Sequence, residues 1–450
     1  MLKRVLFSTL GMTDPMKNDF DGPMLHILRH YRPQKVYLFM TKRVCELAEQ
    51  DNRYRLQIEY LCKQENFNCE IIELRYENID KPQQFDLFYP LFEKELIKIH
   101  QENPSSQLLI NLSSGTPQMK STCHLLALTL GFPVVPIQVT TPNEQENYGM
   151  PIFDVDLHWK NNLDNHPDMG IKNRCTVVEF TNLRYLFLRE AAINYIRAFE
   201  YKAAFTVLQP VREFVSASAL HLLQAAVYRK NMELSAAEKE ARLAGYDLFP
   251  VKSGDVEELF EYLLVLQIQQ QTGDLMNFVR GISPALSKLF EGFLEEKCRR
   301  KVKTDYCYRS GRNRDIYKIS REKLAREPAL LACYDRCFES QYQDSFLACS
   351  SLLPMIIFDC GAGGAYADPE VVERAEKLRA VEEEIRNTAA HTITAVTEKQ
   401  FTKIAGLSSK QVMEMLVWFF EKTYPQHIPN RSKCWESYKI MNEDIIRQLK

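Results

Sequence analysis

The amino-acid sequence predicts an N-terminal α/β domain built on a doubly wound parallel sheet, followed by an all-α remainder. Short apolar runs alternate with amphipathic segments through residues 3–139, the pattern of strands joined by crossover helices. From about Val178 onwards, apolar residues recur instead at three- and four-residue spacing, the period of helices. At 450 residues and 52.5 kDa the chain exceeds one typical core, so two or three domains are expected.

Five strands are expected in the α/β part, each a short run rich in Val, Leu, Ile and aromatic residues. Amphipathic segments at 23–31 and 88–101 are expected to be helices. Strands that alternate with helices form a parallel sheet, so this part is predicted to be Rossmann-like. The expected strands cover residues 3–9, 35–40, 69–74, 108–112 and 134–139.

Two loops of small polar residues follow the first and fourth expected strands, at 10–15 and 111–120. In doubly wound folds ligands bind beyond the carboxyl ends of the strands, where the strand order reverses. In the common strand order these two strands are neighbours at that point. The second loop runs into a helix and contains Ser113, Ser114, Gly115, Thr116 and Lys120, which suits a phosphate group. The alternative is a turn and helix cap that bind no ligand.

The loop matches neither G-x-G-x-x-G nor a Walker A sequence, which argues against a dinucleotide oxidoreductase or an ATPase. Residues 148–175 are expected to be an irregular connector. Helices are expected at 182–207, 211–230, 234–244 and 256–271, forming a scaffold between two functional parts. The expected domains are 1–174, 175–281 and 282–450.

The C-terminal part contains a strongly basic loop at 309–314, just after Tyr306 and Tyr308. Basic side chains next to aromatic rings suit single-stranded RNA, with phosphates on the charges and bases on the rings. An ordinary basic surface loop explains the same residues equally well.

A second chemical motif lies in residues 382–391, which are expected to be helical because Glu and Ala are strong helix formers. Asn387 and His391 are four residues apart and share one face of that helix. Arg386 and His391 are separated by about 140° around the axis, so they can flank one site. A His can accept or donate a proton, and an Arg can neutralise a phosphate, which together suit metal-free RNA cleavage. A charged surface helix is the alternative.

Residues 386–391 read Arg-Asn-Thr-Ala-Ala-His and resemble the active-site motif Arg-Asn-x-x-x-His of HEPN ribonucleases. Residues 113–119 resemble the signature loop of CARF domains. The chain as a whole resembles the CARF-plus-HEPN accessory ribonucleases of type III CRISPR systems (the Csm family). The resemblance implies that Arg386, Asn387 and His391 are catalytic.

The resemblance further implies a single-strand-specific endoribonuclease of antiviral defence that is a homodimer activated by a cyclic oligoadenylate. The activator would be cyclic tetraadenylate or hexaadenylate, and some relatives slowly cleave the bound ring. The 282–450 part would be the HEPN domain and 1–174 the CARF domain. The implied ligand contacts are Thr9, Leu10, Gly11, Thr13, Asp14, Asn111, Ser113, Ser114, Gly115, Thr116, Gln118 and Met119.

Composition sets further limits. The twelve cysteines include no C-x-x-C pair, so zinc ligation is not expected, and the chemistry needs no metal or other cofactor. The sequence shows neither a secretory signal nor an apolar run near the ~20 residues that span a bilayer, which predicts a cytoplasmic protein. A formal net charge of −2 argues against a general nucleic-acid coat.

Two rival functions remain open. One is a non-catalytic nucleotide sensor whose helical part docks a partner. The other is a phosphodiesterase that acts mainly on the cyclic nucleotide itself.

Overall fold

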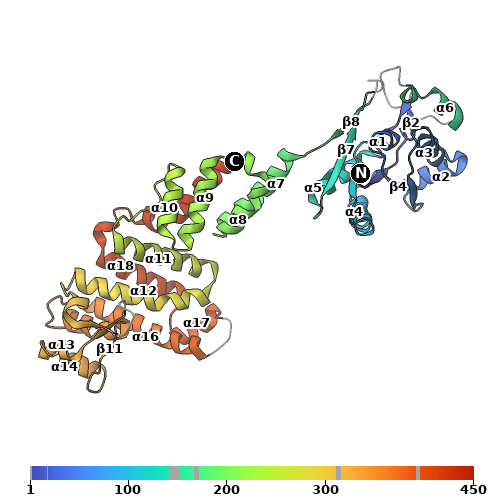
Figure 1. Ribbon diagram of the computed structural model, residues 1–450. Helices are drawn as coiled ribbons and strands as arrows, with labels where there is room; N and C mark the ends of the chain where they lie inside the picture. Colours follow the sequence, from blue (N-terminus) through green and yellow to red (C-terminus); the bar gives the residue numbers. More distant parts are fainter. Residues whose placement is uncertain (1–2, 18, 142–152, 167–171, 311–315, 392–395) are drawn as a thin grey trace. The chain divides into compact units, whose positions relative to one another are not determined.

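The computed structural model describes residues 3–17, 19–141, 153–166, 172–310, 316–391 and 396–450, with backbone alone at 181 and 386–391. The chain divides into two compact units, Met1–Arg184 and Tyr185–Lys450. We call them the α/β unit and the helical unit (Figure 1). Within the described residues, no helix is long and apolar enough to cross a membrane.

The α/β unit is built on a six-stranded sheet with the order β5-β4-β1-β6-β7-β8. The first five are parallel, and β8 runs antiparallel to β7 at the edge. All five expected strands are present, so the predicted doubly wound fold is confirmed. The strands are β1 (Arg4–Thr9), β4 (Lys35–Thr41), β5 (Glu70–Tyr76), β6 (Gln107–Asn111), β7 (Val134–Val139) and β8 (Cys175–Val177).

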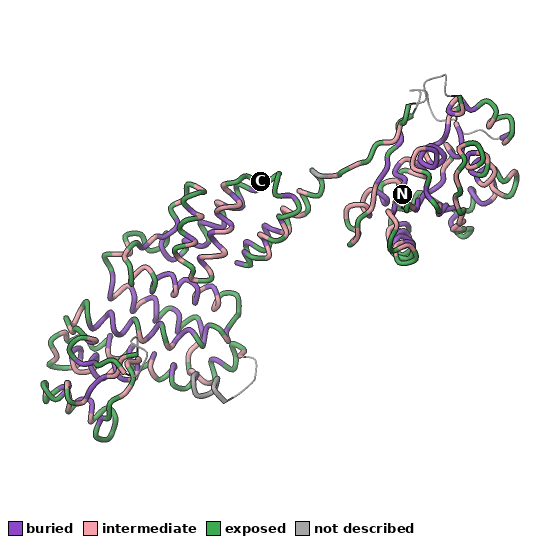
Figure 2. Tube along the Cα trace, viewed as in Figure 1, coloured by how far each residue is buried: buried purple, intermediate pink, exposed green. Residues whose placement is uncertain are grey.

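Helices cover both faces of this sheet because the buried side chains of its strands alternate between two cores. Leu6, for example, faces one core, whereas Phe7 faces the other. The central strands β1, β4 and β6 are almost fully buried, and in Figure 2 the helices around them are exposed along their outer sides. Helices α1 (Pro23–Tyr31), α2 (Lys42–Asp51) and α3 (Arg53–Gln64) pack on the Leu6 side, and α4 (Phe85–Glu102) and α5 (Pro117–Thr129) pack on the Phe7 side.

The strand order reverses between β1 and β6. From β1 the chain passes through α1 to β4 on one side, and from β6 it passes through α5 to β7 on the other. Strands β1 and β6 pair directly, with Phe7 opposite Ile110. The two polar loops therefore leave adjacent strands at the same edge of the sheet, as the sequence predicts.

The segment expected to be an irregular connector contains regular elements. Helix α6 (Val155–Asn161) and the turn η1 (Leu163–Asn165) lie within it, and it ends in β8. Because β8 pairs with β7, residues 175–177 belong to the α/β unit, beyond the expected border at 174. A short hairpin of β2 (Met16–Lys17) and β3 (Phe20–Asp21) also follows the first loop.

The helical unit has one continuous hydrophobic core, from Ala192 to Leu449. The expected domain border at 281/282 falls inside α12 and therefore marks no break in this core. The helices are α7 (Thr181–Arg197), α8 (Tyr201–Leu208), η3 (Gln209–Phe214), α9 (Ala217–Lys230), α10 (Leu234–Leu243), α11 (Gly254–Thr272), α12 (Leu275–Glu296), η4 (Val302–Tyr306), α13 (Arg321–Leu324), α14 (Pro328–Cys337), α15 (Cys349–Cys360), α16 (Pro369–His391), α17 (Glu398–Ala405), α18 (Ser409–Thr423), η5 (Pro425–His427), α19 (Arg431–Trp435) and α20 (Ser437–Leu449).

A buried ion pair joins three of these helices. The guanidinium of Arg229 on α9 donates to both carboxylate oxygens of Glu261 on α11, at 2.7 Å each, and to Ser437 Oγ on α20 at 2.9 Å. The guanidinium carbon also lies 4.1 Å from the centre of the Tyr438 ring. Arg229 and Glu261 are both fully buried. The last helix of the chain is therefore tied to helices near the start of the helical unit.

The helical unit also contains a three-stranded antiparallel sheet with the order β11-β10-β9, which is not among the elements expected from the sequence. Its strands are β9 (Cys307–Arg309), β10 (Tyr317–Ile319) and β11 (Ser345–Phe346). Strands of two or three residues leave almost no periodic signal in a sequence.

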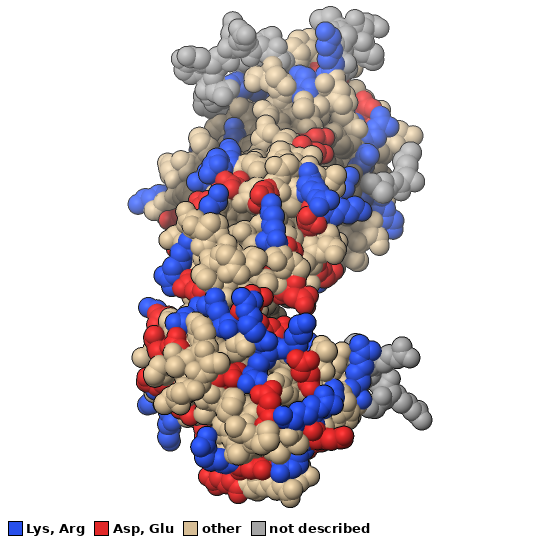
Figure 3. Space-filling view, turned by 90° about the vertical axis from the view of Figure 1, so that its left-hand side faces the viewer, with Lys and Arg blue, Asp and Glu red and all other residues tan. Residues whose placement is uncertain are grey.

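On the face drawn in Figure 3, Lys and Arg side chains lie among Asp and Glu side chains, as the small net charge leads one to expect.

Candidate functional site

The two polar loops of the α/β unit are held together by buried hydrogen bonds. Thr9 Oγ1 donates to the Ser114 carbonyl oxygen at 2.6 Å. Asn111 Nδ2 donates to Ser8 Oγ at 2.9 Å and to Ser114 Oγ at 2.8 Å. None of these four side chains is exposed. Their first role is thus to shape the loops.

Glycine is required where the two loops touch. A Cβ atom on Gly11 would lie 2.8 Å from the Gly115 nitrogen, so the two backbones are in direct contact. Gly115 itself has a φ of +89°, and a Cβ there would lie 2.7 Å from Thr9 Oγ1. Any side chain at Gly115 would therefore strain the backbone and push the loops apart.

Asp14 closes the first loop from inside. Its carboxylate accepts from the backbone nitrogens of Gly11 and Met24 and from Ser114 Oγ, each at 3.1 Å. Burial raises the pKa of Asp14 to about 6 in spite of these hydrogen bonds. Asp14 therefore braces the loops from within.

The second loop ends in the cap of α5. Thr116 Oγ1 accepts from the Met119 backbone nitrogen at 3.4 Å and donates to the Pro82 carbonyl oxygen at 2.8 Å. Pro117 occupies the first turn of the helix, where its missing N–H costs nothing. The N-terminus of α5, with its partial positive charge, thus lies at the edge where the two loops meet.

A pocket of about 360 Å³ opens next to this helix terminus, beyond the carboxyl ends of β6 and β7. Three cationic side chains line it, those of Lys17, Lys120 and Arg174. Its one carboxylate is Asp21, which is bound by Arg29. The full lining is Thr13, Lys17, Asp21, Gly22, Pro23, Leu112, Ser113, Lys120, His124, Gln138, Val139, Thr140, Thr141 and Arg174.

The predicted ligand contacts are distributed unevenly around this pocket. Thr13 and Ser113 line it. Gly11, Gly115, Thr116 and Gln118 are partly exposed near the loop contact. The other six are buried in the hydrogen-bond network or in the hydrophobic cores: Thr9, Leu10, Asp14, Asn111, Ser114 and Met119.

Sequence reasoning missed Lys17, His124 and Arg174. His124 could have been found, because it lies four residues after Lys120 and so shares a face of α5. Lys17 and Arg174 lie in segments that carry no strong pattern, and only the fold brings them to the pocket.

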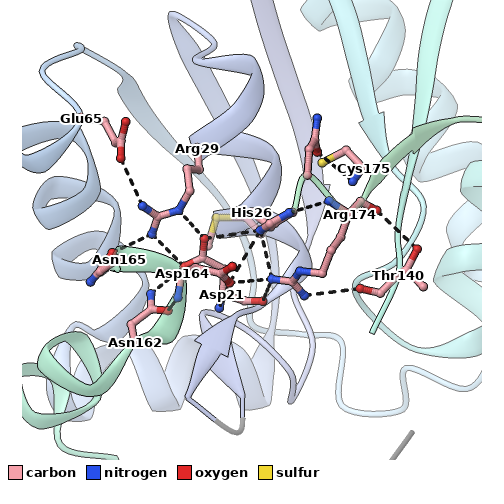
Figure 4. A network of polar contacts seen from close by, with 12 residues as sticks. Asp21, His26, Arg29, Glu65, Thr140, Asn162, Asp164, Asn165, Arg174 and Cys175 are labelled. Carbon is pink, nitrogen blue, oxygen red and sulfur yellow. Dashed lines mark hydrogen bonds and ion pairs between the residues drawn. The ribbon is translucent and has the colours of Figure 1, made fainter. Parts of the chain in front are cut away.

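Arg174 is held in place by a buried polar network (Figure 4). Its Nη2 donates to Asp164 Oδ2 at 2.6 Å, and its backbone nitrogen donates to His26 Nε2 at 3.0 Å. Asp164 also accepts from the Asp21 backbone nitrogen at 2.8 Å. With its side chain only 12% exposed, Arg174 presents a pre-oriented guanidinium to the pocket.

The same network contains three potential metal ligands. One atom from each of Asp21, His26 and Asp164 lies within 4.8 Å of the others. However, Arg29 donates to Asp21 at 2.7 and 3.1 Å, and Arg174 binds Asp164. Burial alone would raise the pKa of Asp21, but hydrogen bonds from His26 and Arg29 outweigh it and lower that pKa to about 2. The carboxylates are thus already neutralised by arginines, and the group fits an ion-pair network better than a metal site.

The predicted catalytic residues all lie near the end of α16, which is helical as expected. The side chains of Arg386, Asn387 and His391 lie outside the described residues. The helix is anchored up to the residue before Arg386 by apolar side chains at three- and four-residue spacing, all of them buried in the core of the helical unit. They are Val371, Ala375, Leu378, Val381 and Ile385.

A buried carboxylate adds a polar anchor one turn before Arg386. Glu382 is 2% exposed, accepts from Ser283 Oγ on α12, and pairs with Arg379 at 2.9 Å. The thiol of Cys349, the first residue of α15, also faces Glu382. Burial and this neighbouring carboxylate raise the pKa of Cys349 to about 12. Helix α16 is therefore fixed between α12 and α15 close to the motif.

The fold and the two sites define a nucleotide-sensing α/β unit joined to a helical effector unit with a HEPN motif. Three family models match the chain in this order: the Cas_Csm6 CARF domain at residues 68–175, the Csm6 6H domain at 178–230 and the Cas_Csm6 HEPN domain at 248–446. The chain belongs to the Csm6 family of CRISPR-associated proteins, and the resemblance stated from its motifs is confirmed.

Individual relatives agree with this assignment. The chain is 27% identical to the CRISPR system endoribonuclease Csm6 of Mycobacterium tuberculosis, over 99% of this chain and 98% of the relative. It is 25% identical to the Enterococcus italicus Csm6 endoribonuclease, over 65% of this chain and 67% of the relative. The solved structure of Enterococcus italicus Csm6 bound to cyclic hexa-2'-fluoro-hexa-dAMP shares the fold, with a TM-score of 0.71 at 18% identity over 99% of this chain and 100% of that chain.

Proposed function

We propose that this protein is a cyclic-oligoadenylate-activated, metal-independent endoribonuclease that cleaves single-stranded RNA in the cytoplasm during type III CRISPR defence. The proposal rests on the presence of two features in one chain. One is a cationic pocket at the switch point of the sheet, and the other is a helix with the Arg-Asn-x-x-x-His motif in the helical unit. The names of the relatives, which are Csm6 endoribonucleases, support it.

The proposed sensor is the edge where the two loops meet. Lys17, Lys120 and Arg174 supply positive charge, and the N-terminus of α5 supplies backbone N–H groups, so phosphates of a cyclic nucleotide suit this edge. Thr13, Ser113, Thr116 and Gln118 are proposed to contact the ligand, while the buried loop residues keep the edge in shape. The Enterococcus italicus relative was solved with a cyclic molecule of six nucleotides, which favours cyclic hexaadenylate over cyclic tetraadenylate as the activator.

The proposed cleavage site is formed by two copies of α16 in a homodimer. One His391 would take the proton of the attacking 2′-hydroxyl, and the other would protonate the leaving 5′-oxygen. The Arg386 guanidinium would stabilise the charge on the phosphate oxygens, and Asn387 would orient the imidazole or bind a phosphate oxygen. The bond from phosphorus to the 5′-oxygen breaks as the bond to the 2′-oxygen forms. The products are a 2′,3′-cyclic phosphate and a 5′-hydroxyl.

A cleavage assay with a quenched fluorescent single-stranded RNA in EDTA tests the proposal. We expect cleavage to require cyclic hexaadenylate and to be unaffected by EDTA. Cyclic tetraadenylate and a linear hexaadenylate are the matched controls. Binding of a ring without any RNA cleavage would contradict the nuclease assignment and leave a sensor that docks a partner.

Arg174 provides a separate prediction about the sensor. Arg174→Met should weaken binding of the activator by about ten- to a hundredfold, because a charge-assisted hydrogen bond contributes about 1.5–3 kcal/mol. Titration calorimetry measures this directly. Lys172→Met is the matched control, since Lys172 is exposed in the same segment and does not line the pocket. Equal affinities of the two variants would remove Arg174 from the ligand site.

A further inference from the structure

The small sheet of the helical unit carries a row of three side chains on one face. In its register Lys318 of β10 lies opposite Tyr308 of β9 and also opposite Phe346 of β11. Directly opposed residues on neighbouring strands point to the same side. Tyr308, Lys318 and Phe346 therefore form one row across the sheet, which we call the aromatic row.

This row faces solvent, whereas the other face of the sheet is part of the core. Phe346 is 59% exposed and Tyr308 is 38% exposed, but Cys307 and Ile319 on the opposite face are almost fully buried. The Lys318 ammonium lies 4.8 Å from the centre of the Phe346 ring. Two aromatic side chains with a cation between them therefore face solvent on this sheet.

The sequence around the row is rich in basic residues. The described residues of 299–323 include eight Lys and Arg but only two Asp and Glu, in a chain whose net charge is −2. Among the described residues, no carboxylate lies within ion-pair distance of Lys318 or Arg309. Arg309 alternates with Tyr308 and so points to the opposite face, where it donates to Tyr317 Oη at 3.1 Å. The Asp344 carboxylate lies beside the Tyr308 hydroxyl, and Lys318 supplies the positive charge that would meet a phosphate.

The aromatic row is also connected to the helix that carries the proposed catalytic residues. Strand β11 ends at Phe346, and three residues later Cys349 begins α15, a distance of at most about 11 Å along the chain. The Cys349 thiol faces Glu382. Glu382 precedes Arg386 by four residues, about 6 Å along α16. The row therefore lies within a few nucleotides of the HEPN motif.

From these observations we infer that the aromatic row binds the RNA substrate, with bases stacked on Tyr308 and Phe346 and a phosphate on Lys318. Stacking on aromatic rings beside a cation is how proteins hold single strands without reading their sequence. Duplex RNA, whose bases are already stacked, would not use the row. The inference rests on the proposed ribonuclease function and adds the surface that selects single strands.

The basic loop hypothesis from the sequence changes accordingly. Tyr308 belongs to the row, but Tyr306 does not, because its side chain is buried and hydrogen-bonded to Arg300 and Glu327. Residues 311–315 lie outside the described residues and are not used in the inference.

The test measures RNA binding by the full-length chain carrying His391→Ala, so that the substrate survives. We expect Tyr308→Ala combined with Phe346→Ala to weaken binding of a labelled single-stranded RNA by about ten- to a hundredfold. Binding of a duplex of equal length should change little. Phe346→Trp should retain the affinity, because indole also stacks on bases. Leu243→Ala is the control, since Leu243 is as exposed as Phe346, at 59%, but lies on α10.

Cleavage kinetics in the otherwise wild-type chain give a second readout. The double variant should show a raised KM for RNA, while kcat at saturating RNA and the affinity for the cyclic activator stay unchanged. If the double variant has the wild-type melting temperature and its RNA affinity and KM are unchanged, the aromatic row does not bind RNA and the inference is overturned. Failure of this inference can be distinguished from failure of the proposed function. If the proposed function is wrong, the wild-type chain will not cleave RNA, but the RNA affinities of the variants will still show whether the aromatic row binds RNA.

Discussion

His391→Ala is expected to reduce activator-dependent RNA cleavage by at least about a thousandfold. General acid–base catalysis contributes about 10²–10⁴-fold, and in the proposed dimer the substitution removes both the acid and the base. The affinity for the cyclic activator should not change, because the residue lies in the helical unit and the pocket in the α/β unit. The measurement is single-turnover cleavage of labelled RNA at saturating activator.

The matched control for this experiment is His427→Ala. His427 lies in η5 of the same unit and has no proposed catalytic role. It should leave cleavage within about twofold of wild type, within the small effects typical of surface positions. Mixing wild-type and His391→Ala chains tests the composite site further, since heterodimers should be strongly impaired. Full activity of the His391→Ala protein would remove this residue from the mechanism.

Arg229→Met is expected to cost the helical unit about 3–5 kcal/mol of unfolding free energy. Removing one partner of a buried ion pair leaves the other charge buried without compensation, and this is the usual size of the penalty. Here the group left without its ion-pair partner would be the Glu261 carboxylate, which is fully buried between α9, α11 and α20. Urea unfolding followed by circular dichroism measures the loss.

Two further variants make this prediction specific. Arg229→Met combined with Glu261→Leu should recover much of the stability, because no unpaired charge remains. Arg242→Met should change stability by less than about 1 kcal/mol, since its pair with Glu238 on α10 is exposed. Similar losses for Arg229→Met and Arg242→Met would show that burial of the first pair has no energetic consequence.

The parts of the fold that could be predicted are those with a repeating pattern. The five parallel strands are apolar runs long enough to be recognised, and their alternation with helices specifies the sheet and its switch point. Strand β8 has only three residues, so nothing in the local sequence distinguishes it from a connector. The pair of Arg229 and Glu261 is separated by 32 residues and depends on how two helices pack, which no local pattern reveals.

The same distinction applies to the sites. The loops at 10–15 and 111–120 could be predicted because small polar residues directly follow strands. Which of their side chains face a ligand could not, since Thr9 and Asn111 are used up in buried hydrogen bonds between the loops. Tyr306 and Tyr308 are equivalent by composition. They differ because Tyr306 ends η4 and is hydrogen-bonded to Arg300 and Glu327 in the interior, whereas Tyr308 lies in β9.

The wall of the ligand pocket reaches the first turn of α7 in two ways. Arg174 immediately precedes β8, and only three residues separate that strand from α7. In addition, the ring of His124, which lines the pocket, lies edge-on to Phe180 with 5.6 Å between ring centres. The Phe180 carbonyl oxygen accepts the Arg184 backbone N–H at 2.9 Å, a hydrogen bond of the first turn of α7.

Phe180 therefore contacts both the pocket wall and the first turn of α7. Its backbone, with a φ of 47°, is in a left-handed conformation that a bulky residue adopts only when its surroundings hold it there. Because the His124 ring both lines the pocket and packs on Phe180, the residue before α7 is held in part by a residue of the pocket.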